Sequence, residues 1–90
     1  MNINYATQQN LRFIDVMAQH IGQVHVEPLI AFFGLSSATG TRIFRLYREL
    51  RPDNLVYDTA IRRYVKAGTF KPLFNNDEPP FFDDEKASQV

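Results

Sequence analysis

The residues with the clearest binding chemistry in this sequence are arginines spaced one helical turn apart. Arg42, Arg45 and Arg48 share one face if residues 37–50 form a helix. Guanidinium groups bind phosphate oxygens and the acceptor edge of guanine through paired hydrogen bonds. A second cationic group follows at Arg62, Arg63 and Lys66. This spacing predicts a surface that binds a polyanion.

The formal net charge of zero conceals two oppositely charged parts of the chain. Residues 1–75 contain nine basic and five acidic residues, a net charge of +4, whereas residues 76–90 contain one lysine and five acids, a net charge of −4. Within the first part, residues 42–71 alone carry eight basic and three acidic residues, or +5. Such asymmetry raises the expectation of a polyanionic partner.

Other chemistries have weaker support. The chain has no cysteine, and His20 and His25 have no carboxylate cluster near them in sequence, so we expect no metal. Ser36 and Ser37 precede a predicted helix without a nearby base, which favours capping over nucleophilic catalysis. Phosphate-binding loops, dinucleotide fingerprints and acid/base pairs do not occur. We therefore expect no cofactor and no enzymatic activity.

Size and hydrophobicity bound the class of protein. Ninety residues with 44% hydrophobic content fit one small domain with a single core. The longest apolar run, residues 28–33, is far shorter than a membrane span, and the N-terminus lacks the order of charges and apolar residues found in a signal peptide. We expect a cytoplasmic protein without a membrane partner.

The elements before the arginines are predicted from apolar spacing. Leu11, Ile14, Ala18 and Ile21 recur at helical spacing, which predicts a helix over 7–21 with Thr7 as N-cap and Gly22 as its end. Residues 23–26 alternate as a short strand does. Residues 28–33 predict a second helix that begins with proline and ends at glycine.

The sequence Gly34-Leu35-Ser36 is typical of the turn between two helices. The third helix, over 37–50, turns an apolar face inward at Ile43, Leu46, Tyr47 and Leu50. Gly40 weakens this helix by about 1 kcal/mol relative to alanine, which suggests that the second helix approaches closely there.

A β-hairpin follows the third helix. Residues 54–57 and 62–66 alternate as strands do, and residues 58–61 connect them. Phe70, Leu73 and Phe74 are expected to fold back onto the core. The remaining aromatic core candidates are Phe13, Phe32, Phe33 and Phe44.

This order of elements predicts a mainly α fold with a small β-hairpin, a winged helix-turn-helix. Residues 1–75 would form the domain, and residues 76–90 a disordered acidic tail. Double-stranded DNA is the expected partner, and the fold places the third helix in the major groove. The predicted DNA-binding residues of that helix are Ser36, Ser37, Thr39, Thr41, Arg42, Arg45 and Arg48. Those of the wing and its flank are Arg51, Arg62, Arg63 and Lys66.

Several local motifs resemble the N-terminal winged helix of WYL-domain bacterial transcription regulators. They lie between Leu29 and Phe74 and comprise Phe33-Gly34-Leu35-Ser36, Tyr47-Arg48-Glu49-Leu50, Pro52-Asp53-Asn54-Leu55-Val56-Tyr57-Asp58, Arg63-Tyr64-Val65 and Phe70-Lys71-Pro72-Leu73-Phe74. The preceding Leu11-Arg12-Phe13-Ile14-Asp15 fits the same pattern. The resemblance implies a repressor of the kind associated with phage-defence operons, encoded by a bacterium or a mobile element.

The sequence leaves open the domain content of the protein, its oligomeric state and the role of its acidic tail. Regulators of the usual length in that family continue into a WYL ligand-sensing domain, whereas this chain ends at Val90, so we expect a stand-alone domain without that sensor. The resemblance leaves a homodimer and its surface undecided. The alternative to a DNA-binding function is a protein-interaction module whose acidic tail docks a partner through Phe81-Phe82. If the protein binds DNA, the same tail either competes weakly with DNA for the arginines or is inert.

Overall fold

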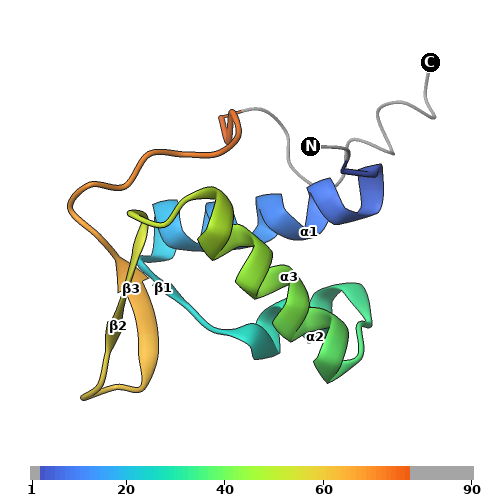
Figure 1. The fold of residues 1–90 in the computed structure, drawn as a ribbon, viewed down its shortest axis with the longest axis horizontal. Helices are drawn as coiled ribbons and strands as arrows, with labels where there is room; N and C mark the ends of the chain where they lie inside the picture. Colours follow the sequence, from blue (N-terminus) through green and yellow to red (C-terminus); the bar gives the residue numbers. More distant parts are fainter. Residues whose placement is uncertain (1–2, 78–90) are drawn as a thin grey trace.

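The computed structural model describes residues 3–77. It contains three α-helices, a π-helical turn and a small antiparallel sheet (Figure 1). In chain order the elements are α1 (Tyr5–Val16), η1 (Met17–Ile21), β1 (Gln23–Val24), α2 (Val26–Phe33), α3 (Ser37–Leu50), β2 (Leu55–Asp58) and β3 (Arg63–Lys66). This architecture confirms the predicted fold class. Residues 78–90, with most of the predicted tail, lie outside the described residues.

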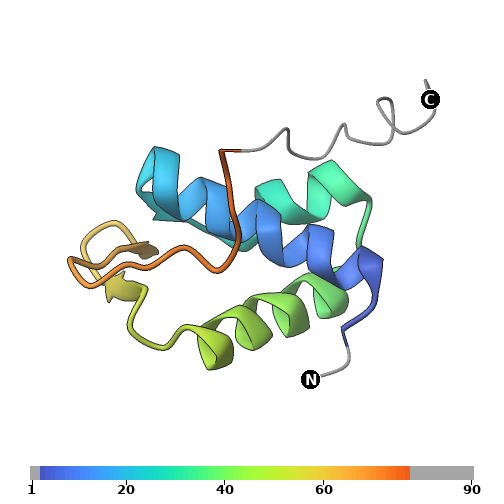
Figure 2. The same cartoon turned by 90° about the horizontal axis from the view of Figure 1, so that it is seen from above.

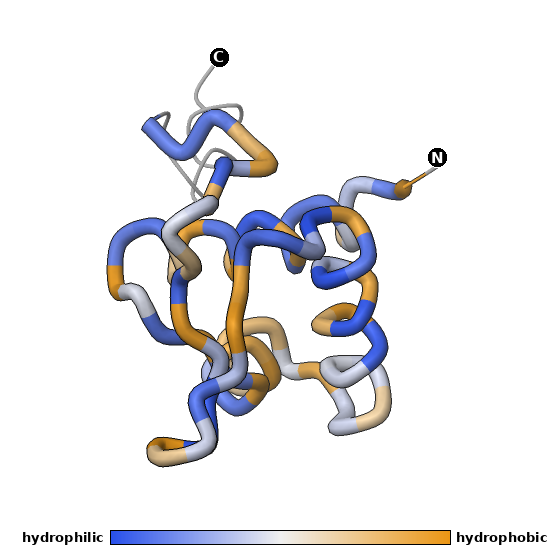
Figure 3. The backbone as a smooth tube through the Cα atoms, turned by 60° about the vertical axis from the view of Figure 1, so that its left-hand side comes forward, coloured by the Kyte–Doolittle hydropathy of each residue, from blue (hydrophilic) through white to orange (hydrophobic). Residues whose placement is uncertain are grey.

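The three helices pack against one another around one core (Figure 2). Figure 3 shows hydrophobic and hydrophilic residues interspersed along the chain. Both kinds occur throughout α1 and α3, as an amphipathic helix requires, whereas Glu27 is the one charged residue of α2. The fully or almost fully buried apolar side chains are Leu11, Ile14, Met17, Ala18, Val24, Leu29, Ile43, Phe44, Tyr47 and Leu55. Among residues 3–77, no helix has the length and apolar character needed to cross a bilayer.

The first helix begins earlier than predicted. Asn4, with an extended backbone, is the N-cap, and its Oδ1 accepts a hydrogen bond of 2.8 Å from the backbone N–H of Thr7. Thr7 therefore lies inside the first turn, and its prediction as the cap was wrong. Gly22 ends η1 in the left-handed region at φ 87°, as expected. The wider π-helical turn shifts the helical phase, so Ile21 is 70% exposed instead of buried.

The sheet has the strand order β1–β3–β2, with Tyr57 opposite Tyr64 and Asp58 opposite Arg63. The connection is therefore residues 59–62, one position later than predicted. Asp58 Oδ1 accepts a 2.9 Å hydrogen bond from the N–H of Ala60, which starts the turn after Asp58. β1 is shorter than predicted because His25 is already the N-cap of α2.

A buried polar network fastens the segment after the hairpin to the helices. Asp15 is fully buried, and its Oδ1 accepts a 2.6 Å hydrogen bond from the hydroxyl of Tyr47. Its Oδ2 accepts from the backbone N–H groups of Leu73 and Phe74 and from Asn76 Nδ2, at 2.9, 3.1 and 2.7 Å. The carboxylate is thereby hydrogen-bonded on both oxygens, which burial requires.

Asn54 completes this network between α3 and the same segment. Its Nδ2 donates to the Tyr47 hydroxyl at 3.0 Å and to the carbonyl of Lys71 at 2.8 Å. Its Oδ1 accepts from the N–H of Lys71 at 2.9 Å. The ordered segment therefore continues at least to Asn76, inside the range that the sequence assigned to the tail.

The aromatic residues are less uniformly buried than predicted. Phe44 is buried, and Phe13, Phe33, Phe70 and Phe74 are partly buried against the core. Phe32 is 49% exposed, so its assignment to the core was wrong. The side chain of Leu29 takes the buried position of α2 instead, because an eight-residue helix turns only one side to the core.

Candidate nucleic-acid interface

The turn before α3 sets where this helix begins. Gly34 adopts φ 67°, a left-handed conformation that suits glycine, and the N–H of Leu35 then bonds the carbonyl of Ile30 at 3.0 Å. Ser36 is the N-cap, and its Oγ accepts from the N–H of Thr39 at 3.1 Å. The Ser36 hydroxyl also donates to Thr39 Oγ1 at 3.0 Å. The hydroxyls of Ser36 and Thr39, both predicted to bind DNA, are therefore hydrogen-bonded to each other at the start of the helix.

The approach of α2 to α3 depends on Gly40. A Cβ atom at this position would lie 2.6 Å from Ile30 Cγ1 and 3.1 Å from Val26 Cγ2. Contacts this short force neighbouring atoms to move. The small residue therefore allows the two helices to pack closely, as the sequence suggested, and this packing determines which face of α3 remains in solvent.

The face of α3 opposite the core carries the predicted binding side chains. Ile43, Phe44 and Tyr47 are buried, and Leu46 and Leu50 are partly buried against the core. The exposed residues on the other side include Ser37, Thr41, Arg42, Arg45 and Arg48. The helical spacing therefore brings the three arginines to one solvent-facing surface, where their guanidinium groups are accessible to a ligand.

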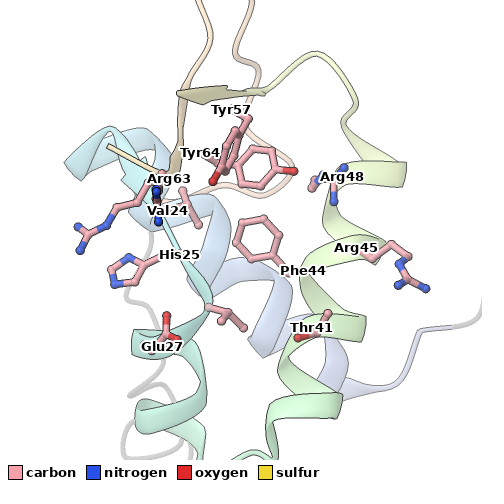
Figure 4. Close-up of a pocket in the computed structure, with 12 residues that line it drawn as sticks. Val24, His25, Glu27, Thr41, Phe44, Arg45, Arg48, Tyr57, Arg63 and Tyr64 are labelled. Carbon is pink, nitrogen blue, oxygen red and sulfur yellow. The ribbon is translucent and has the colours of Figure 1, made fainter. Parts of the chain in front are cut away.

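A hollow of about 360 Å³ lies between α3, the hairpin and the start of α2; we call it the wing hollow (Figure 4). Aromatic rings form part of its wall. Tyr64 lies with its ring centroid 5.3 Å from that of Phe44 and 5.1 Å from that of Tyr57. The rings join α3 to both strands of the hairpin, so the helix and the wing hold a defined relative position.

The rim of the wing hollow is strongly cationic. Four arginines contribute to its lining, Arg45 and Arg48 from α3 and Arg62 and Arg63 from the hairpin, whereas Glu27 is the one carboxylate among its lining residues. The guanidinium carbon of Arg48 lies 4.9 Å from the centroid of the Tyr64 ring, a cation–π contact. The remaining lining residues include Val24, His25, Val26 and Thr41. This combination suits a ligand with negative charge and a flat or apolar portion.

Six predicted binding residues lie outside the hollow's lining, namely Ser36, Ser37 and Thr39 at the start of α3 and the basic residues Arg42, Arg51 and Lys66. Lys66 Nζ approaches the carbonyl of Gln19 at 3.4 Å and lies 5.4 Å from the Phe70 ring centroid. Arg51 caps the end of α3, with one guanidinium nitrogen 3.2 Å from the carbonyl of Leu50. Arg42 is exposed on α3, nearer to its N-terminal end than Arg45 and Arg48.

Sequence reasoning missed Tyr57 and Tyr64 as members of the site. They are direct cross-strand partners in the hairpin, and side chains of such pairs lie on the same face of a sheet. A one-residue shift of the predicted connection concealed this pairing. His25 and Glu27, also missed, enter the hollow because β1 pairs with β3 and thereby brings the start of α2 beside the wing.

Comparison with known proteins adds a family match. The family model for the BrxR transcriptional regulator winged helix-turn-helix domain matches residues 6–80. A DNA-binding transcriptional repressor CapW from Stenotrophomonas maltophilia is 36% identical over 76 residues, covering 84% of this chain. A second CapW repressor, from Pseudomonas aeruginosa, is 33% identical over 70 residues, covering 78%. The matches cover 25% and 23% of these relatives, so the chain spans about a quarter of their length.

Proposed function

The chain belongs to the family of BrxR transcriptional regulator winged helix-turn-helix domains, and on this premise we propose that it binds double-stranded DNA to regulate transcription as a repressor. The CapW relatives from Stenotrophomonas maltophilia and Pseudomonas aeruginosa are both named DNA-binding transcriptional repressors. The observation that carries the proposal is the shared surface of α3 and the hairpin, where Arg45, Arg48, Arg62 and Arg63 surround one hollow.

In this proposal α3 enters the major groove with its N-terminal half. Thr41 and Arg42 then face base edges, because they are exposed in the first two turns of the helix. Arginine supplies a bidentate contact to guanine, the threonine hydroxyl can bond to any base edge, and the threonine methyl group contacts the methyl group of thymine. Ser37 lies at the helix start beside the same groove. Sequence discrimination rests on these residues.

The wing hollow then receives the sugar–phosphate backbone of one strand. Arg45 and Arg48 approach the phosphates from the helix, and Arg62 and Arg63 approach them from the hairpin. The rings of Tyr57 and Tyr64 offer apolar surface to deoxyribose. The hollow thus fixes the register of α3 on the duplex, and the four cations supply the part of the affinity that depends on salt.

A single domain of this kind covers one half-site, so specific repression calls for a second copy of the DNA-binding unit. We therefore infer a dimer on the operator, which implies a two-fold symmetric sequence. Sedimentation of the protein with duplexes that contain one or two copies of a selected half-site distinguishes one bound chain from two.

The test of DNA binding is a fluorescence-anisotropy titration of the protein against a labelled random duplex at 50 and 200 mM salt. Several phosphate contacts predict an affinity that falls steeply between these concentrations, with a slope of about 0.9 per contact in a plot of log K against log salt. Selection from a randomised duplex library then yields the preferred half-site. No binding to any duplex at the lower salt would contradict the proposal.

The comparisons do not favour the alternative of a winged-helix module that binds only proteins. That alternative predicts no duplex binding at either salt concentration, together with an intact fold by circular dichroism. The same titration therefore distinguishes the two functions.

A further inference from the structure

An apolar groove lies on a part of the molecule that does not contribute to the wing hollow. Its volume is about 320 Å³, and the start of α1, the end of α2 and the following turn line it; we call it the aromatic groove. The lining residues are Tyr5, Ala6, Gln9, Asn10, Phe32, Phe33 and Leu35. Tyr5 is 60% exposed and Phe32 is 49% exposed. Large exposed aromatic side chains that gather around a hollow are typical of a binding site.

The rings beside this groove already form a cluster. The Phe32 centroid lies 4.9 Å from those of both Phe13 and Phe33, and the centroids of Phe13 and Phe33 are 5.6 Å apart. Edge-to-face geometry holds between Phe32 and Phe33, at an interplanar angle of 79°. A further phenyl ring extends such a cluster favourably, because ring edges and faces carry opposite partial charge.

The C-terminal part of the described chain lies against α1, the helix whose start lines this groove. The carbonyl of Asn75 accepts a 3.2 Å hydrogen bond from the guanidinium of Arg12, and Asn76 Nδ2 donates to Asp15 and Gln19, both at 2.7 Å. Residues 75 and 76 therefore lie against α1 (Figure 2). Arg12 directly precedes Phe13, a member of the aromatic cluster.

The next large apolar residues in the sequence are Phe81 and Phe82, four and five positions after Asp77. Four to five extended residues span roughly 13–18 Å. Along α1, the seven residues from Arg12 back to Tyr5 correspond to about 10 Å. The chain is therefore long enough for Phe81 and Phe82 to reach the groove without displacing Asn75 or Asn76.

We propose that Phe81 and Phe82 bind intramolecularly in the aromatic groove, so that this segment covers Phe32 and Tyr5. Pro79 and Pro80 precede the pair, and their fixed φ angles reduce the entropy lost on docking. The covalent connection raises the effective concentration of the pair at the groove above that of any free partner. Asp83, Asp84 and Glu85 follow the pair, and the proposed arrangement leaves them in solvent because the groove-lining residues within 3–77 are uncharged.

This proposal does not depend on DNA binding, because the aromatic groove and the wing hollow share no lining residue. It assigns the acidic segment to a surface of its own domain instead of to the arginines of α3. A second copy of the chain and the arginine surface are the two other locations that the experiment must distinguish.

The experiment uses a nitroxide spin label next to the phenylalanine pair. The sequence has no cysteine, so Asp84→Cys in the full chain gives a single labelling site. Nuclear magnetic resonance then reports which amide and methyl signals the label broadens. We expect selective loss of the signals of Ala6 and Leu35, with the signal of Val56 in the hairpin retained as a distant reference. Reduction of the nitroxide must restore the lost signals.

Two variants locate the contact. Phe81→Ala with Phe82→Ala, in the labelled chain, is expected to restore the Ala6 and Leu35 signals, whereas Gln89→Ala leaves their loss unchanged. Phe32→Ala, which changes the groove itself, should also restore the Ala6 and Leu35 signals. The amide spectrum of this variant shows whether the domain remains folded.

Three results would overturn the proposal. Broadening centred on Arg45 and Arg48 would place the segment on the arginine surface, and weak broadening of all signals would show that it does not dock. Broadening that appears when labelled chains are mixed with separate isotope-enriched chains would assign the groove to a second copy. None of these results bears on the duplex titration, so failure of this proposal and failure of DNA binding are distinguishable.

Discussion

Arg42 and Arg48 lie on the same exposed face of α3 but differ in their surroundings. Arg48 stacks on the Tyr64 ring and lines the wing hollow, which restricts its guanidinium to the side nearest the hairpin. Arg42 lies further toward the N-terminus of the helix and outside the lining of the hollow. These surroundings suit Arg48 to backbone phosphate and Arg42 to a base edge.

Arg42→Ala is expected to weaken binding to a selected duplex by about 1–3 kcal/mol, the free energy of one bidentate base contact. Binding to random duplex should weaken less, because only a charge is removed there. Arg42→Lys is the matched control: it keeps the charge but lacks the planar fork, so it should retain random binding and lose discrimination. Titration of each variant against both duplexes measures the two affinities.

Thr41→Ala should also weaken binding to the selected duplex more than binding to random duplex, by a smaller amount than Arg42→Ala. Equal losses of affinity for the two duplexes would contradict a base-reading role.

Tyr47 performs a different task on the buried side of the same helix. Its hydroxyl links Asp15 to Asn54 within the core. Burial, and secondarily the hydrogen bond to Asp15, raise the pKa of Tyr47 well above its ordinary value of 10.0. The neutral phenol is therefore the form that stabilises the fold.

Tyr47→Phe should lower the free energy of unfolding by about 1–3 kcal/mol, since it removes two buried hydrogen bonds while keeping the ring. Because folding raises the pKa, the contribution of this hydroxyl is fully present below the unfolded value near 10 and is lost as the pH rises above it. The difference in stability between the native chain and the variant should therefore shrink above pH 10. Urea unfolding at pH 7 to 11 measures it, with Tyr57→Phe as an exposed control. A difference that stays constant across this range would contradict the assignment.

At the scale of elements, the position of α3 depends on its contact with α2. Gly40 allows this contact, although alanine would favour the helix itself by about 1 kcal/mol. An added Cβ atom would press against Ile30 and Val26 and so oppose that gain, because overpacking typically costs about 1–3 kcal/mol. Packing thus outweighs helix propensity at this position.

Gly40→Ala is therefore expected to destabilise the domain by about 1 kcal/mol in thermal or urea unfolding. Gly68→Ala is the matched control, because an added Cβ atom there meets nothing within 4 Å. Ile30→Ala removes the atoms closest to the added Cβ. In the Ile30→Ala chain, Gly40→Ala should therefore lower the free energy of unfolding by less than it does in the native chain. An unchanged cost in the Ile30→Ala chain would show that the clash is not the cause.

The hairpin forms the second half of the cationic surface. Arg62 lies in the connection with φ 57°, and Arg63 opens β3 opposite Asp58. Both side chains are exposed and line the wing hollow. The substitution Arg62→Ala with Arg63→Ala should weaken binding to all duplexes and reduce the salt slope by about 0.9 for each phosphate that the variant no longer neutralises.

Titrations at four or more salt concentrations measure this slope. Lys71→Ala is the control, since it removes an exposed cation that does not line the wing hollow. Its slope should equal that of the native chain. If the double arginine variant also kept the native slope, the wing would not touch the DNA backbone.

At the scale of the whole molecule, the sequence separates a cationic part from an acidic part. The net charge of residues 76–90 is −4 and that of residues 42–71 is +5, so electrostatic competition for the arginines is one expectation from sequence. At about 0.15 M ionic strength the Debye length is roughly 8 Å, which weakens attraction between solvated charges. In the proposed arrangement the phenylalanine pair occupies the aromatic groove, whose described lining residues differ from those of the wing hollow, and the arginines stay accessible to DNA.

A chain that ends at Asp77 should therefore bind duplex with the same affinity as the full chain at low and at physiological salt. This end point retains Asn76, whose amide donates to Asp15, so the buried network stays complete. Parallel titrations of both chains against one duplex make the comparison. Tighter binding by the shortened chain, most pronounced at low salt, would support competition for the arginines.

Local sequence alone determined the number and order of the helices, the turn and the family resemblance, although α1 and α2 each begin two residues earlier than predicted. The bounds of α3 match the prediction, because the Ser36 cap, the inward apolar spacing and Pro52 act within a few residues of one another. The same spacing also predicted which side of α3 is exposed. The N-cap of α1 was predicted three residues too late and the hairpin connection one residue too early, since several polar residues there are equally good candidates for the cap or turn.

Only the tertiary structure decided which of these residues meet. The contacts of Tyr47 with Asp15, of Asp15 with Leu73, and of Tyr64 with Phe44 join residues 20 to 58 positions apart. Such contacts depend on the angles at which helices and sheet pack, which no local pattern encodes. For the same reason Lys66 lies toward Phe70, away from the wing hollow, while Tyr57 and Tyr64 line it. Charge and periodicity predicted a cationic surface, and packing determined its shape.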